Sequence, residues 1–542
     1  MTLGLAERQG DLLDDLNRFC EQALPESSVY ALLNRERDRL FPDEMFADLY
    51  SERGRRSVPP CVVATVMVLQ RLEGLSDREA VDRYAFDARW RYAAGVGGYD
   101  GDGWARFAHT VLVDMRARLA ASKDPRRLFR VALDAASAAG LVGAKRVLGS
   151  TPLYDAVATM DTITLIRSAI RALLKAADDV LRGELRAVLT SGDDYASPSK
   201  PQVDWDDTAA REDLIDSRAR DGYALLAVLD GRKFGPVVAD AAVLLATVLG
   251  QDLETTEDGV FRIARRVAKD RVISTVDPQA RHGHKTAARG FDGYKGHVAA
   301  DPDSEIITDT EVSAGNVGDA AVAADLIDDL LNRDQGDGDQ GDGDPEGAQD
   351  GGTEQPDVYG DAAYGSGEFQ DTLAGAKIAS HCKTQPPTAP AGRFSKDQFN
   401  IDLNSDTVTC PTGQTARVRR DEHGDGTAYF ASACTDCPLR AQCTTARDGR
   451  SIKVGRYEQR LADARQQQHD PSWVEKYRAT RPKVERKLGH LMRRKHGGRR
   501  ARMRGTIKID ADFNLLATAH NLARLAVLNV RSTTTGWAAA TA

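Results

Sequence analysis

The chain has 542 residues, of which 41% are hydrophobic and 28% charged, and this length and composition predict a globular protein of about three or four domains. No segment approaches the roughly 18 uncharged apolar residues of a membrane-spanning helix, which excludes that class of membrane protein. The N-terminus also lacks the basic and apolar regions of a secretion signal. We therefore predict a cytoplasmic protein with no membrane partner.

Charge is distributed unevenly along the chain. The formal net charge is −8, yet residues 471–505 hold thirteen Lys and Arg against two Glu. Residues 334–357 are acidic and include no basic residue. Because a local concentration of one sign of charge indicates a partner better than the average does, the basic segment is compatible with nucleic acid.

The first 140 residues are predicted to form a helical domain. The apolar run 62–72 follows two prolines, which suit a helix start. The sequence from Ser76 to Glu79 fits a capping box for a second helix, which we expect to end near Tyr84. Two helices joined by so short a turn resemble a DNA-binding helix-turn-helix, although the same pattern is more common in ordinary helical hairpins. On either interpretation, residues 1–140 are the candidate DNA-binding domain.

Residues 141–333 are predicted to form the first part of an α/β core that holds a helical insertion at about 161–268. The pattern gives a short strand, two strands in a hairpin and an amphipathic helix. These elements are expected at 145–148, 293–300, 305–312 and 320–331.

The rest of the core is predicted to follow a linker rich in Gly and Asp. Residues 334–357 cannot bury enough apolar surface to fold, so we predict a disordered linker. A core strand and its surroundings should occupy 358–380, a cysteine-rich insertion 381–450, and the basic helix with C-terminal helices 451–542. The sum is an α/β core split by insertions and preceded by an all-α domain.

Two acids stand out as candidates for chemistry. Asp361 follows a short strand, at the kind of strand end where α/β sheets place their sites. Glu485 is one of the two acids within the basic helix. In-line cleavage of a phosphodiester calls for divalent ions held by carboxylate oxygens, and Mg²⁺ prefers oxygen ligands. Each acid also has an ordinary structural alternative, as a turn residue and as an ion-pair partner.

Five of the seven cysteines fall between residues 382 and 443. Cys434 and Cys437 form a C-x2-C pair, with Cys443 and Cys410 on either side. Four thiolates can close a tetrahedral structural zinc site, and this set is our zinc hypothesis. The alternative is a group of reduced thiols without metal.

Several stretches resemble the signature sequences of the DDE transposases of bacterial insertion sequences. They are 40–44 (LFPDE), 74–79 (GLSDRE), 148–157 (LGSTPLYDAV), 293–298 (GYKGHV), 360–368 (GDAAYGSGE) and 481–486 (RPKVER). The resemblance implies a ribonuclease-H-like catalytic core, DNA cleavage and strand transfer with Mg²⁺ or Mn²⁺, and binding to terminal inverted repeats and target DNA. It also implies a homo-oligomer on paired DNA ends.

Carried over residue by residue, the resemblance makes Asp361 the second catalytic acid and Glu485 the third, both as Mg²⁺ ligands. The first acid should stand in the run at 148–152, but position 149 is Gly149, which offers no ligand. Asp155 and Asp161 are the neighbouring acids that could replace it. The candidate DNA contacts on and after the basic helix are Arg481, Lys483, Arg486, Lys487, Arg493 and Arg494.

Three functions follow from this pattern. The first is a transposase by descent, which would cut and join DNA with Mg²⁺ at Asp361, Glu485 and a third ligand that Gly149 does not supply. The sequence leaves two alternatives for this copy, an inactive site and a site in which a neighbouring acid replaces the missing ligand. The second is a DNA-binding protein that is derived from a transposase and does not cleave. The third is a zinc-stabilised structural protein, against which the basic helix argues.

Overall fold

The computed structural model describes residues 1, 15–97, 106–155, 159–197, 203–204, 206–286, 288–333, 355–388 and 390–539. Most of the linker predicted at 334–357 therefore lies outside the described residues. Among the helices of the described ranges, none has both the length and the apolar character that crossing a bilayer demands.

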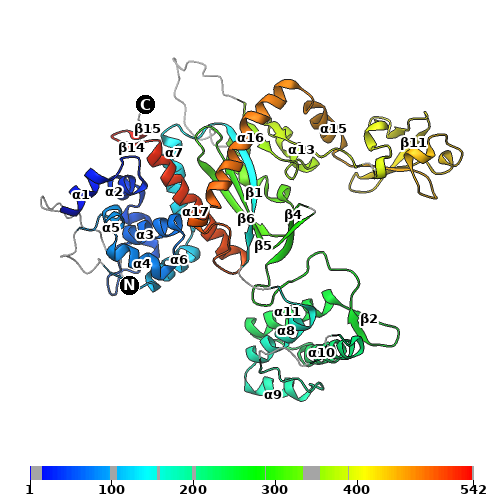
Figure 1. Ribbon diagram of the computed structural model, residues 1–542, viewed down its shortest axis with the longest axis horizontal. Coiled ribbons are helices and arrows are strands. Elements are labelled where there is room, and N and C mark those ends of the chain that lie inside the picture. Colours follow the sequence, from blue (N-terminus) through cyan, green and yellow to red (C-terminus); the bar gives the residue numbers. More distant parts are fainter. Residues whose placement is uncertain are drawn as a thin grey trace.

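The centre of the molecule is a mixed sheet built around β1 (Lys145–Tyr154). β5 (Arg289–Ala300) pairs with one edge of β1 in the antiparallel direction, and β7 (Asp357–Gly360) pairs with the other edge in the parallel direction. β8 (Ala379–Cys382) continues the sheet parallel to β7. Helices lie against this sheet (Figure 1), so the predicted α/β fold class is confirmed.

The outer edge of β5 pairs with two further strands, one after the other along its length. β4 (Arg281–Thr286) and β6 (Ile307–Ala314) both run antiparallel to β5. The β5–β6 pair is the predicted hairpin. β1 is longer than its predicted four residues, because Ser150 to Tyr154 keep the pairing with β5 as far as Gly293.

Two long helices cover one face of the sheet, and shorter ones cover the other. α16 (Pro471–Leu491) and α17 (Thr506–Val527) enclose a core with the inward side chains of β1, β5 and β6. The opposite core includes α13 (Gly367–Gly375). The single helix predicted for 320–331 is wrong. The chain there forms short turns, ending in α12 (Asp328–Leu331), which keep Leu326 and Ile327 buried without a continuous helix.

The N-terminal helices pack around α3 (Pro60–Glu73), whose residues are buried from Pro60 to Arg71. The others are α1 (Asp15–Ala23), α2 (Val29–Leu40), α4 (Asp77–Phe86), α5 (Ala88–Ala94), α6 (Thr110–Ala121) and α7 (Arg127–Ala138). The predicted capping box is present, since the Ser76 side chain accepts from the Glu79 N–H and the Glu79 carboxylate accepts from the Ser76 N–H. One side of α17 contributes Leu515, Leu522 and Leu525 to this core.

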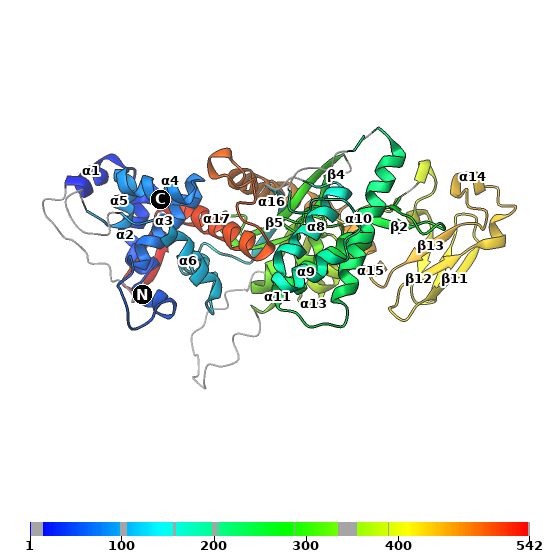
Figure 2. The same ribbon diagram turned by 90° about the horizontal axis from the view of Figure 1, so that it is seen from below.

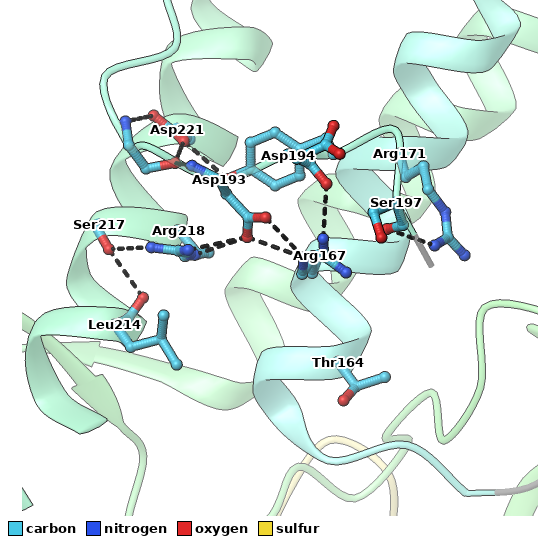
Figure 3. Close-up of polar contacts among 12 residues, drawn as sticks. Thr164, Arg167, Arg171, Asp193, Asp194, Ser197, Leu214, Ser217, Arg218 and Asp221 are labelled. Carbon is cyan, nitrogen blue, oxygen red and sulfur yellow. Dashed lines mark hydrogen bonds and ion pairs between the residues drawn. The ribbon is translucent and has the colours of Figure 1, made fainter. Parts of the chain in front are cut away.

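The helical insertion projects from the sheet as a separate bundle (Figure 1). It contains α8 (Thr162–Ala176), α9 (Asp179–Ala187), α10 (Thr208–Leu229) and α11 (Pro236–Asp252). A buried ion-pair cluster stabilises the helical insertion (Figure 3). Asp193, whose side chain is only 5% exposed, accepts from the guanidinium groups of Arg167 and Arg218.

A small antiparallel sheet lies at the far end of the molecule from the N-terminal helices (Figure 1). Its strands are β9 (Asn400–Asp402), β10 (Thr407–Thr409), β11 (Thr415–Arg420), β12 (Gly426–Tyr429) and β13 (Ser451–Val454). They are ordered β13-β12-β11-β10-β9. α15 (Glu458–Gln467) then leads back to α16.

Candidate active site

Asp361 lies directly after β7, in the middle of the main sheet. β7 and β1 are parallel, with Val147 opposite Tyr359, so two residues further along this register Asp361 comes beside Gly149. The Asp361 carboxylate accepts from the Ala363 N–H at 2.9 Å, and its carbonyl accepts from the Tyr364 N–H at 3.1 Å. These bonds turn the chain away and leave the carboxylate at the end of the strand.

Glu485 reaches the same place from α16. Val484 and Leu488 on this helix are buried against the sheet, whereas the Glu485 side chain is 63% exposed. The Arg481 Nη2 atom lies 3.0 Å from Asp361 Oδ2 and 3.0 Å from Glu485 Oε1. The structure therefore brings the two predicted acids, 124 positions apart in the sequence, onto one guanidinium group.

Arg481 is nearly buried at this junction, with its side chain 9% exposed. Its Nε and Nη1 atoms have no hydrogen-bond partner among the described residues. A desolvated guanidinium is costly unless carboxylates compensate for it. In this structure Arg481 offsets the mutual repulsion of the two acids, a role that a divalent cation would otherwise take.

Gly149 occupies the position where the resemblance requires the first acid. It lies within β1 opposite Val298, and its backbone is not in the left-handed region, so conformation does not require glycine here. A Cβ atom at this position would lie 2.9 Å from Leu488 Cδ1 and 3.0 Å from Val484 Cγ2. Side chains of α16 thus fill the space that a side chain at 149 would enter.

Neither neighbouring acid compensates for the glycine. Because β1 continues to Tyr154, Asp155 lies six residues along an extended strand, about 20 Å from position 149 at 3.3 Å per residue. Asp161 is the N-cap of α8, where its carboxylate accepts from the Thr164 N–H at 2.9 Å. Both acids belong to the approach to the helical insertion.

The donor set at this site fits a pair of divalent cations only in part. Asp361 and Glu485 supply carboxylate oxygens, but Gly149 supplies none, and Arg481 lies between the two acids. Across the part of the chain that the structure describes, no three His, Cys, Asp or Glu residues are grouped so as to hold a metal ion. The residues present therefore do not complete a two-metal site.

A cavity of about 580 Å³ opens beside Glu485, between α16 and the residue that follows β8, Lys383. The rings of Trp473 and Tyr477 stack at 5.1 Å with an interplanar angle of 7°. The Lys383 Nζ atom lies 4.5 Å from the centre of the Tyr477 ring. Trp473 was not among the site residues predicted from the sequence, although its spacing of four from Tyr477 and eight from Arg481 indicates one helical face.

The predicted DNA-contacting residues fall into two groups. Lys483 pairs with Asp303 at 3.0 Å, and Arg486 pairs with Glu305. Lys487 is only 4% exposed, and burial lowers its pKa to about 8. These side chains, like Arg481, are engaged within the protein. Arg493 and Arg494, in contrast, are exposed in the loop that follows α16.

That loop also covers the turn between α3 and α4. Gly74 has a left-handed conformation (φ 69°), and a Cβ atom there would lie 2.6 Å from the Lys495 carbonyl oxygen. The Arg502 guanidinium donates to the Leu75 carbonyl. The exposed side of α4 carries charges of both signs, including Arg78 and Glu79. This arrangement favours a helical hairpin that is packed within the protein.

The four cysteines of the zinc hypothesis line one small cavity beneath the small sheet. All four are free thiols. Cys410 Sγ lies 3.0 Å from the Thr412 hydroxyl oxygen, and Cys434 Sγ accepts from the Arg450 N–H at 3.4 Å. Cys382 is elsewhere, buried on β8.

Comparison with known proteins gives two family matches. The model of a family described as "Transposase DDE domain" matches residues 409–526, which include Glu485 and the four clustered cysteines but neither Asp361 nor Gly149. A second model, described as "Transposase domain (DUF772)", matches residues 18–118. No curated protein and no solved structure matches the chain.

The two matches bear on different parts of the molecule. One covers the N-terminal helices, and the other covers the small sheet and the helices α16 and α17. Both are transposase models, and the DDE family implies DNA as partner and a divalent cation as cofactor. The resemblance predicted from the sequence is confirmed, because both matching models describe transposase domains and together they support a DDE transposase of an insertion sequence.

Proposed function

We propose that this chain is a transposase that binds the terminal inverted repeats of its element. We further propose that it does not cleave DNA or transfer strands, because Gly149 stands where the first catalytic acid is needed. The observation that carries the proposal is the contact of Asp361 and Glu485 with one guanidinium, directly beside the strand position of Gly149. Two acids of a three-acid site stand together, and the position of the third holds no side chain.

The chemistry of the lineage uses Mg²⁺ or Mn²⁺, which stabilises the attacking and leaving oxygens of an in-line displacement. Two carboxylates without the third do not complete that site, so we assign no cleavage step to the chain as it stands. The residues that are present still position the two acids and leave room for DNA. Arg481 holds Asp361 and Glu485 in one place, and the cavity lined by Lys383 and Tyr477 is open to a DNA strand.

The proposal includes the finer architecture that was predicted from the sequence. A ribonuclease-H-like core, split by the helical and cysteine-rich insertions, is supported by the parallel neighbours β1 and β7 and by the acid-bearing helix against them. A homo-oligomer that pairs two DNA ends in the cytoplasm belongs to the same proposal. Size-exclusion chromatography with light scattering, with and without end DNA, tests the oligomer.

A structural zinc ion at Cys410, Cys434, Cys437 and Cys443 is also proposed. The four thiols line one cavity, which supports the proposal. They must move closer together to bind the ion, because no three of them are grouped as metal ligands in the described structure. We expect one zinc ion per chain by elemental analysis of protein purified without chelator, and none in the Cys434→Ser/Cys437→Ser variant. A parent protein that contains no zinc when purified with added zinc contradicts this part of the proposal.

The central experiment restores the missing acid. The full chain, Gly149→Asp and Gly149→Asp/Glu485→Gln are compared for cleavage and strand transfer on DNA that carries the element ends, with Mg²⁺ or Mn²⁺. We expect products from Gly149→Asp alone. Since the new side chain meets Leu488, the set also includes Gly149→Asp/Leu488→Ala, which gives it room.

Binding to the same DNA is measured separately by fluorescence anisotropy. The proposal expects all these variants to bind end DNA more tightly than a scrambled duplex of equal length. Cleavage by the unmodified chain would refute the role given to Gly149. Failure of both Gly149→Asp proteins to cut, while they fold and bind, would leave the DNA-binding protein without catalysis as the correct function.

A further inference from the structure

The outer face of the small sheet carries a group of basic and aromatic side chains. Val418, Ala428 and Ile452 point inward, where they are buried. Their neighbours on the same strands point outward, because side chains alternate along a strand. The outward residues Arg417, Arg419, Tyr429 and Lys453 are exposed, and we call these four residues the basic face.

The strand register gathers these side chains into one patch. Arg419 is opposite Thr427, and Thr427 is opposite Lys453, so the two cations are two strands, or about 10 Å, apart. Arg417 is two residues from Arg419 and on the same face. The other outward positions of these strands hold uncharged Thr and Ser, including Thr415 and Ser451. The patch thus contains hydrogen-bond donors and positive charge, without an acid on β11, β12 or β13.

The cations of the basic face are not used within the protein. In the described structure Arg417, Arg419 and Lys453 make no ion pair and no side-chain hydrogen bond, whereas the adjacent Arg420 pairs with Asp406 at 2.7 Å. Exposed cations that nothing neutralises, held on a rigid sheet, attract a polyanion.

Two acids at the edge of the patch take part in the turn between β11 and β12. Asp421 accepts from the His423 N–H at 2.9 Å and from the Asp425 N–H at 3.0 Å. Asp425 accepts from the Arg456 N–H at 3.0 Å. Both carboxylates therefore fold the turn and leave the cations of the strands uncompensated.

A groove of about 810 Å³ follows this surface. It is lined by Arg419, Thr427, Tyr429 and Lys453, among others. Tyr429 is 58% exposed, an unusual position for a large aromatic side chain, and its ring can pack on a sugar or a base. The groove is shallow and polar, which suits an extended backbone better than a compact small molecule.

We propose that the basic face binds the phosphodiester backbone of DNA. This inference rests on the proposed function and adds a second DNA contact to it. The small sheet lies at the end of the molecule farthest from the N-terminal helices and beyond α15 from the acid-bearing helix α16 (Figures 1 and 2). The bound DNA is therefore a segment away from the acids. We expect the Arg, Lys and Thr side chains of this sheet to contact phosphates, and contacts to phosphates are independent of sequence.

The test uses the full chain and a labelled duplex of about three helical turns, with affinity measured by anisotropy between 50 and 300 mM KCl. The test variant is Arg417→Ala/Arg419→Ala/Lys453→Ala. The matched control, Lys175→Ala/Arg186→Ala/Lys233→Ala, removes the same charge from exposed positions of the helical insertion, which make no ion pair within the described part of the chain. Melting temperatures of both verify folding.

The salt dependence gives the expected size of the effect. Each lost phosphate contact reduces the slope of log K against log salt by about 0.9, so the triple variant should be shallower than the parent by about two to three. A variant with Lys at positions 417 and 419 should keep the parent slope, since a phosphate accepts either cation.

Each outcome has one meaning. A shallower slope for the basic-face variant alone supports the inference. Equal slopes for the basic-face and control variants, with a parent that binds DNA, overturn the inference and leave the proposed function intact. A parent that binds no DNA at 50 mM KCl overturns the proposed function and this inference together.

Discussion

Glu311 provides a sharp test of the charge distribution beside the sheet. It lies on β6, half-buried, and burial raises the pKa of its carboxyl from 4.5 to about 7, assisted by the nearby Asp510 and Asp309 and opposed by Arg126. Burial likewise raises the pKa of Asp510 on α17 to about 6, against the opposing effect of Arg126 and with Asp309 nearby. Asp325 is the other acid near Glu311. One cation thus faces four carboxyl groups.

The sign of the effect follows from linkage. The folded state binds a proton on Glu311 up to about pH 7, whereas the unfolded chain releases it near pH 4.5. The stability contributed by this proton is complete below pH 4.5 and is lost as the pH rises through about 7. Glu311→Gln, which stays neutral, should match the parent at pH 5 and be more stable than the parent at pH 8.5.

The size of the effect is limited by exposure. At 1.36 kcal/mol per unit, the shift from 4.5 to about 7 gives a ceiling of about 3 kcal/mol. Because the carboxylate is half-exposed, solvent screening reduces this to about 1 kcal/mol. For a cooperative unit of about 200 residues, that free energy of unfolding corresponds to about 2–4 °C in Tm.

The assay is the melting temperature by circular dichroism at pH 5, 7 and 8.5 for the parent, Glu311→Gln and the control Glu257→Gln, which changes an exposed loop acid. The difference between Glu311→Gln and the parent should grow with pH, and that of the control should not. A constant difference across the range would refute the assignment of the shifted titration to Glu311.

Three further changes test the packing and the ion pairs. Gly149→Ala should cost about 1–3 kcal/mol by overpacking, and Leu488→Ala in the same chain should recover part of it, measured as a double-mutant cycle of Tm. Asp193→Asn removes the charge that pairs with the buried Arg167 and the partly buried Arg218, and it should destabilise the helices of the insertion by about 3–5 kcal/mol, followed by far-ultraviolet circular dichroism. Tyr294→Phe removes a 2.8 Å hydrogen bond to the buried Asp277 and should cost about 1.5–3 kcal/mol in denaturant unfolding.

Each of these changes has a contradicting result. Additive effects of the Gly149 and Leu488 substitutions would mean that the two positions are not in contact. For the ion-pair cluster, the control is Asp179→Asn, which breaks an exposed pair with Arg182 and should change stability by less than about 1 kcal/mol. Equal losses of stability for Asp193→Asn and Asp179→Asn would contradict the expectation that a buried ion pair contributes more than an exposed one. A Tyr294→Phe variant with the same free energy of unfolding as the parent would mean that water replaces the lost hydrogen-bond donor.

Much of the local structure could be predicted from the sequence because periodicity and capping are local. The start of α4 at its capping box and the hairpin of β5 and β6 are examples. The helix predicted for 320–331 failed because apolar spacing alone does not show whether tight turns can bury the same side chains. The extension of β1 to Tyr154 depends on pairing with β5, a partner that lies far along the chain.

The candidate site was predictable in its acids and not in its contacts. Asp361 and Glu485 could be named from their motifs, but their shared partner Arg481 had the appearance of a free DNA contact. Lys487 likewise is indistinguishable by sequence from the exposed Arg493. Burial is decided by how α16 rests on the sheet, and a run of alternating cations and apolar residues does not reveal which cation lies beneath the helix.

The last long helix, α17, has a consequence for synthesis of the protein. One side of it completes the core of the N-terminal helices and the other completes the core of the main sheet. Neither core is closed until residues 506–527 have left the ribosome, so the part of the α3 surface that α17 covers stays exposed through most of translation. Translation products that stop before this helix would expose both cores. Such products would be bound by chaperones and degraded by proteases, and they would not compete with the full chain for DNA ends.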